Sequence, residues 1–96
     1  MNARDQEQAS LDVCREIAMG EQVVLENEQQ ANVVYIAAML CRTSDAKISA
    51  RLQKVAAVFF ANNPEEQLST QQTLQRGWII SLPRFRSMLE RHLGIN

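Results

Sequence analysis

The sequence is poor in the residues that form turns and sheets. Its 96 residues include only three glycines and two prolines, and the aromatic fraction is 5%. A many-stranded barrel or sandwich needs more turn residues and more aromatic or β-branched side chains than this. The hydrophobic fraction of 46% is too high for a disordered chain. The composition therefore predicts a small helical protein, and the length is that of one domain.

The sequence also lacks a long apolar run. The longest, residues 33–41, has nine residues, whereas a membrane-spanning helix needs about 18. Residues 1–10 are polar and do not resemble a secretory signal. Cys14 and Cys41 lie in apolar helical stretches without metal-ligand neighbours, so we expect them to pack in the core as free thiols in a reducing compartment. These features predict a cytoplasmic protein that does not enter a membrane.

The charge of the chain is balanced overall but not along its length. The net charge is −1, from 10 basic and 11 acidic side chains. Residues 1–50 carry four basic and eight acidic side chains, and residues 51–96 carry six basic and three acidic ones. Such an asymmetry is a cue for an anionic partner at the basic half. It is equally consistent with an acidic half that faces the basic half of the same protein.

Apolar residues recur at helical spacing along most of the chain. Residues 1–9 lack this pattern and are predicted to form a flexible polar tail before a single helical domain, residues 10–96. The first predicted helix spans residues 10–26, although Gly20 within it could instead break the helix. Residues 31–41 are apolar almost all round and are predicted to form the buried central helix.

The second half of the chain carries clear helix start and stop signals. Residues 43–45 combine cap residues with an acid and predict a helix start, and residues 62–64 predict its end, because proline disfavours α geometry in the preceding residue. A fourth helix is expected within 64–76 and a fifth within 81–93. The predicted buried side of the fifth helix consists of Leu82, Phe85, Leu89 and Leu93. The predicted fold is an all-α bundle of about five helices without significant sheet.

The sequence offers little material for catalysis. His92 is the only histidine, and nothing local places it beside either cysteine. Zinc-ligand spacing, a phosphate-binding loop and a nucleophile elbow are all missing. We therefore expect a protein that is not an enzyme, with no catalytic residues, no metal and no cofactor.

Residues 68–93 have the outline of a DNA-binding motif, with a capped short helix, a glycine, a turn and a second capped helix. This segment resembles a helix-turn-helix. The resemblance implies that the second helix enters the major groove while the first lies against the DNA backbone. It implies DNA contacts by seven polar residues, namely Gln71, Gln72, Arg76, Arg84, Arg86, Ser87 and Arg91.

A second segment, residues 36–52, has a similar helix–turn–helix outline, and a basic stripe of Lys47, Arg51 and Lys54 begins in it. A solvated basic face on an ordinary bundle helix explains both segments as well as DNA binding does. The leading hypothesis from the sequence is nonetheless a small DNA-binding protein that acts in transcription regulation.

The rival hypothesis is a helical protein–protein interaction module, such as an anti-activator, a secretion chaperone or a phage or plasmid adaptor. It depends on two runs of three consecutive apolar residues. A helix buries only one stripe on its own core, so each run leaves an apolar side chain outside. We expect a homodimer interface to cover them, formed by Val23, Val24, Leu25, Val58, Phe59 and Phe60. The alternative is that the runs lie at helix ends where several elements converge.

Overall fold

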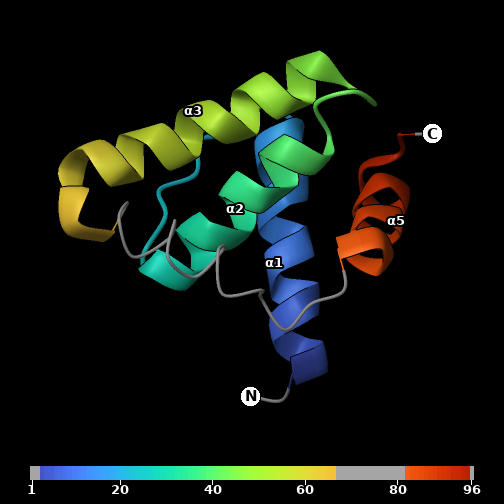
Figure 1. The fold of residues 1–96 in the computed structure, drawn as a ribbon, viewed down its shortest axis with the longest axis horizontal. Helices are drawn as coiled ribbons and strands as arrows, with labels where there is room; N and C mark the ends of the chain where they lie inside the picture. Colours follow the sequence, from blue (N-terminus) through green and yellow to red (C-terminus); the bar gives the residue numbers. More distant parts are fainter. Residues whose placement is uncertain (1–2, 67–81, 96) are drawn as a thin grey trace.

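A computed structural model describes residues 3–66 and 82–95, with side chains from residue 8 onward. The labelled helices are α1 (Ala3–Ala18), α2 (Glu28–Leu40), α3 (Ala46–Asn62) and α5 (Leu82–Leu93) (Figure 1). Residues 64–66 are again helical, and these ranges contain no strand. The predicted all-α class is confirmed. The remainder of the predicted fourth helix lies outside the described residues.

The first helix differs from the prediction at both ends. Residues 10–26 were predicted to be helical, but α1 begins at Ala3 and ends at Ala18. Residues 3–9, expected to be a flexible tail, are mostly strong helix formers, so helical propensity extends α1 beyond the apolar pattern. No apolar period marks that extension, which is why the spacing of apolar residues missed it.

Gly20 ends α1 rather than continuing it. Its φ is +88°, a left-handed conformation that glycine adopts without steric cost. The Gly20 amide donates to the Ile17 carbonyl at 3.0 Å, and the Glu21 amide donates to the Glu16 carbonyl at 3.1 Å. These two bonds form a Schellman cap, which satisfies the last carbonyls of the helix. Residues 19–27, the α1–α2 connection, are consequently non-helical.

The next two helices begin and end where side chains cap the backbone. Asn27 accepts a hydrogen bond from the Gln30 amide at 2.9 Å and begins α2. Asp45 accepts from the amides of Lys47 and Ile48 at 3.0 and 3.1 Å and begins α3. The predicted start at residues 43–45 is confirmed, and so is the predicted end at residues 62–64, where Asn63 is the C-cap.

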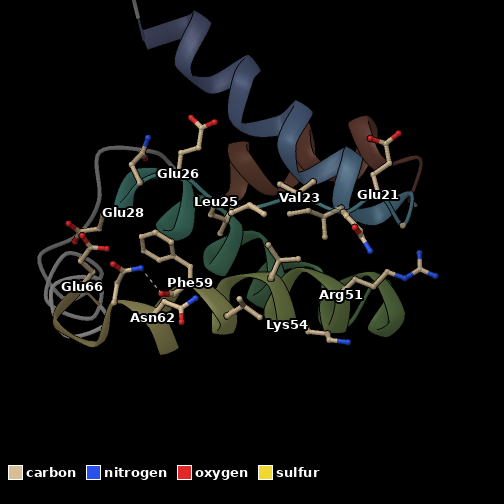
Figure 2. A pocket seen from close by; sticks show the side chains of 18 residues that line it. Glu21, Val23, Leu25, Glu26, Glu28, Arg51, Lys54, Phe59, Asn62 and Glu66 are labelled. Carbon is tan, nitrogen blue, oxygen red and sulfur yellow. Dashed lines mark hydrogen bonds between the residues drawn. The ribbon is translucent and has the colours of Figure 1, made fainter.

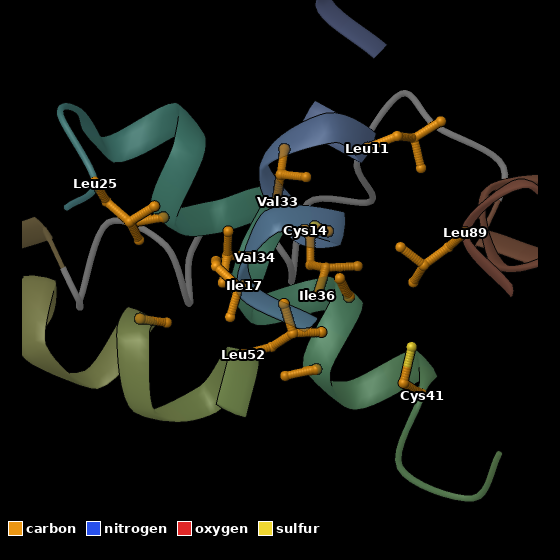
Figure 3. Packing of buried hydrophobic residues seen from close by; sticks show 14 of the residues in the cluster. Leu11, Cys14, Ile17, Leu25, Val33, Val34, Ile36, Cys41, Leu52 and Leu89 are labelled. Atoms are coloured by element: carbon orange, nitrogen blue, oxygen red, sulfur yellow. The ribbon is translucent and has the colours of Figure 1, made fainter. Parts of the chain in front are cut away.

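The core is assembled around α2, which contacts α1, α3 and α5. Seven of its 13 residues are buried, as predicted for a central helix. α1 packs across α2 and α3 and also contacts α5 (Figure 1). The largest fully buried side chains come from the four labelled helices and the residue after α2. They are Phe85 and the residues Cys14, Val34, Ile36, Cys41, Leu52 and Leu89, which Figure 3 labels.

The last helix packs on α1 and α2 through Phe85 and Leu89, which are buried as predicted. Leu82 is a correction: it was predicted to be buried, but it is the first residue of α5 and remains 48% exposed. Gly94, with φ of +73°, ends the helix, and the amide of buried Ile95 donates to the Glu90 carbonyl at 2.8 Å. This Schellman cap turns the chain end back onto the core.

Candidate protein-interaction groove

The α1–α2 connection and α3 enclose a groove of about 810 Å³ (Figure 2). Both apolar runs singled out in the sequence reach it, although they are more than thirty residues apart. Five of the six predicted interface residues line the groove: Val23, Val24, Leu25, Val58 and Phe59. The sequence predicted surplus apolar residues, and the tertiary structure brings them to one surface.

The apolar side chains of the groove divide into a buried floor and an exposed edge. Leu25 and Phe59 are buried and Val23 is half-buried, so these three also belong to the protein's own core. Val24 is 87% exposed and Val58 is 57% exposed. In the connection, neighbouring side chains alternate between the core and solvent. On α3, Val58 projects outside the stripe that faces the core, as expected for a run of three apolar residues in a helix.

Phe60 is the predicted interface residue that does not line the groove. It is buried, and its ring meets that of Tyr35 edge to face at a centroid distance of 6.2 Å. Phe60 also meets the Phe59 ring at 5.7 Å in the same manner. Such contacts hold Phe60 between α2 and α3. It therefore packs within the protein's own core, as the rival interpretation of converging elements expects.

Charged side chains surround this apolar centre, with acids on the connection, bases on α3 and one further acid, Glu66, beyond the end of α3. The connection and the start of α2 contribute Glu21, Glu26 and Glu28, whereas α3 contributes Arg51 and Lys54 (Figure 2). The Arg51 guanidinium donates from Nη1 to the Ala18 carbonyl at 2.6 Å. It thereby places a cation at the C-terminal end of α1, where the helix dipole favours positive charge. The basic stripe predicted on α3 thus has one member that holds α1 to α3.

Two of the predicted DNA-binding residues on α5 form hydrogen bonds within the protein. Arg86 forms an ion pair with Glu90 at 2.9 Å and donates to the Thr43 hydroxyl at 3.0 Å. The Ser87 hydroxyl donates to the Pro83 carbonyl at 3.1 Å within the same helix. Arg86 therefore fastens α5 to the loop between α2 and α3, a contact that no local pattern could reveal.

The remaining DNA-binding candidates fall into two groups. Arg84 and Arg91 are exposed on α5, away from buried Phe85 and Leu89. Gln71, Gln72 and Arg76 lie outside the described residues. The first half of the helix-turn-helix resemblance therefore lies outside the described residues, and DNA binding stays a prediction.

Neither cysteine lies in an environment that would activate its thiol as a nucleophile. Burial, together with a smaller contribution from the neighbouring Cys41, raises the pKa of Cys14 to about 12. Burial also raises the pKa of Cys41 to about 11, with smaller contributions from the charges of Glu90 and Asp45. Both cysteines are free and buried, as predicted. At neutral pH each thiol stays protonated, and a protonated thiol is a poor nucleophile.

His92 pairs with a carboxylate rather than with a cysteine. Its Nε2 lies 3.1 Å from Asp12 Oδ1, and this contact joins α5 to α1. Eighty residues separate the two in sequence, so local spacing gave no signal for it. In the described part of the chain, no group of three His, Cys, Asp or Glu side chains could hold a metal ion.

None of the helices in the described ranges has both the length and the apolar character needed to cross a membrane. Comparisons of the chain with models of protein families, with curated proteins and with solved structures found no match. The function is therefore inferred from the chain's own surfaces.

Proposed function

We propose that this protein is a helical protein–protein interaction module whose contact surface is the groove between the α1–α2 connection and α3. The observation that carries this proposal is the convergence of the two apolar runs, which leaves Val24 and Val58 exposed on one surface. An apolar centre with a charged rim is the usual arrangement of a protein interface.

The energetics favour a partner at this surface. Complete burial of a valine side chain contributes roughly 1.5 to 3 kcal/mol. Five large apolar side chains stand exposed among the described residues. Val24 and Val58 line the groove, and Met19 directly precedes Gly20, which also lines it. Exposed apolar residues that gather on one surface, rather than being scattered singly, are typical of interaction sites.

Site-specific photo-crosslinking in the cells that make the protein tests this proposal. A benzophenone side chain at position 58 should form an adduct with a protein, because that position would lie inside the interface. The matched control carries the same side chain at Met39, an exposed apolar position outside the groove, and should form none. If position 58 gives no protein adduct, the proposal is wrong.

DNA binding through α5 is the second candidate, supported by the exposure of Arg84 and Arg91 on the side opposite Phe85 and Leu89. Arginines that contact phosphates release counterions, so binding should weaken steeply with salt. Fluorescence anisotropy with generic duplex DNA measures this. Changing Arg84 and Arg91 to Ala should abolish binding, whereas Arg15→Ala on α1 should leave it nearly unchanged. The absence of binding by the unmodified protein at low salt would exclude this candidate.

A further inference from the structure

The two walls of the groove carry complementary surfaces. On the connection, exposed Val24 has Glu26 two residues further along the chain, within about 7 Å of backbone reach. On α3, exposed Val58 has Lys54 one helical turn earlier, about 6 Å along the axis. Each wall therefore presents an apolar side chain with one charge beside it at a similar spacing, and the two charges have opposite sign.

We propose that a second copy of this chain occupies the groove, with Val24 of each copy packed against Val58 of the other and Glu26 of each beside Lys54 of the other. This inference rests on the proposed protein-binding function and names the partner. A two-fold pair repeats every contact. The arrangement thus buries four exposed valines and forms two opposite-charge pairs from residues that one chain already contains.

The charges of the connection and of α3 also disfavour the competing symmetric arrangements. If the connections of two copies met, Glu26 and Glu21 of one copy would face the same acids of the other. If the α3 walls met, Lys54 and Arg51 would face their own copies. Like charges placed opposite each other are destabilising. Only the arrangement in which the connection meets α3 places acids against bases on both sides of the two-fold axis.

Sedimentation equilibrium of the full chain at tens of micromolar, a range that populates complexes of ordinary affinity, tests the proposal. The expected mass is twice 10.9 kDa. Val24→Asp should weaken the dimer roughly a hundredfold or more, because it places a charge in the apolar centre. A monomer for the unmodified protein at these concentrations would overturn the inference.

Charge reversal then tests the pairing itself. Glu26→Lys alone and Lys54→Glu alone should each weaken the dimer roughly tenfold, because each puts two like-charge pairs in the interface. An equimolar mixture of the two single variants should restore the dimer as a mixed species. Lys47→Glu is the matched control, since it reverses an exposed charge on α3 outside the groove. Circular dichroism of every variant confirms that the fold is intact.

The mixture is decisive because a Glu26–Lys54 contact within one chain cannot be restored by mixing two reversed chains. If mixing leaves both variants as weak as they are alone, the proposed pairing is wrong. The crosslink at position 58 separates this inference from the proposed function. An adduct of twice the chain mass supports the second copy. An adduct only with another protein overturns self-association and retains the binding function, and no adduct overturns both.

Discussion

The two buried cysteines provide a quantitative test of the fold. Cys14 and Cys41 are both 0% exposed, and burial raises their pKa values from 9.0 to about 12 and about 11. The thiolate is the reactive form. At pH 8 the folded protein should therefore hold roughly a thousandfold less Cys14 thiolate, and roughly a hundredfold less Cys41 thiolate, than the unfolded chain. Burial also keeps a thiol reagent away from both side chains, so each thiol should react even more slowly than its loss of thiolate alone would predict.

The assay follows the reaction of both thiols with a disulfide reagent such as 5,5′-dithiobis(2-nitrobenzoate), in buffer and in concentrated urea. In urea both thiols should react at the rate of an ordinary exposed cysteine. In buffer both should react at least a hundredfold more slowly, and Cys14→Ala and Cys41→Ala variants assign the two rates. A native rate within tenfold of the unfolded rate for either thiol would refute the packing described for it.

The same pKa shifts set the direction of the pH dependence of stability. A thiol with a raised pKa in the folded state favours folding while it is protonated in both states. This contribution is complete below pH 9, and it declines as the pH rises toward about 11 for Cys41 and about 12 for Cys14. The loss is about 1.4 kcal/mol per thiol for each pH unit in that range. Urea midpoints should fall less steeply above pH 9 in the Cys14→Ala variant than in the unmodified protein.

The other predictions concern stability and are measured by urea unfolding. Gly20→Ala should destabilise the protein by about 1 kcal/mol, because alanine disfavours the left-handed φ while its methyl group meets no other atom; an unchanged midpoint would contradict the cap. Asp45→Ala should lower the free energy of unfolding by about 1 kcal/mol through the loss of the α3 N-cap. Asp45→Asn should retain most of the stability that this cap contributes. Leu52→Ala should cost about 2 to 5 kcal/mol, because the fully buried side chain leaves a cavity. The exposed control Met39→Ala should change stability by less than about 0.5 kcal/mol, and equal losses for these two variants would place Leu52 outside the core.

Helix boundaries were predictable from the sequence where short-range contacts decide them. Asp45 bonds to amides two and three residues ahead, and Asn63 stands before a proline. The end of α5 at Gly94 is equally local. At Gly20 two local outcomes compete, since glycine in a helix costs only about 1 kcal/mol and a glycine cap contributes a similar amount. The sequence left both outcomes open there, and the structure has the cap.

The candidate site was predictable only in part. Each run of three consecutive apolar residues has more apolar surface than one helix can bury. This surplus of apolar surface could be predicted from helical geometry. Which residues of the runs are buried and which stay at the groove could not be predicted, because this depends on tertiary contacts: Phe60 packs on Tyr35, whereas Val58 remains at the groove. The acidic wall was also missed. The predicted helix 10–26 would have held Glu21 and Glu26 on a helix instead of along a non-helical connection.

The sequence by itself determined the all-α class, the buried central helix and the free core cysteines, because periodicity, capping and burial preference act through the residue itself and its near neighbours. Only the tertiary structure decided which distant residues meet. It placed His92 on Asp12, Arg86 on Thr43 and the two apolar runs on one groove. Such contacts depend on how whole helices pack, and packing is the sum of many weak contacts that no single motif records.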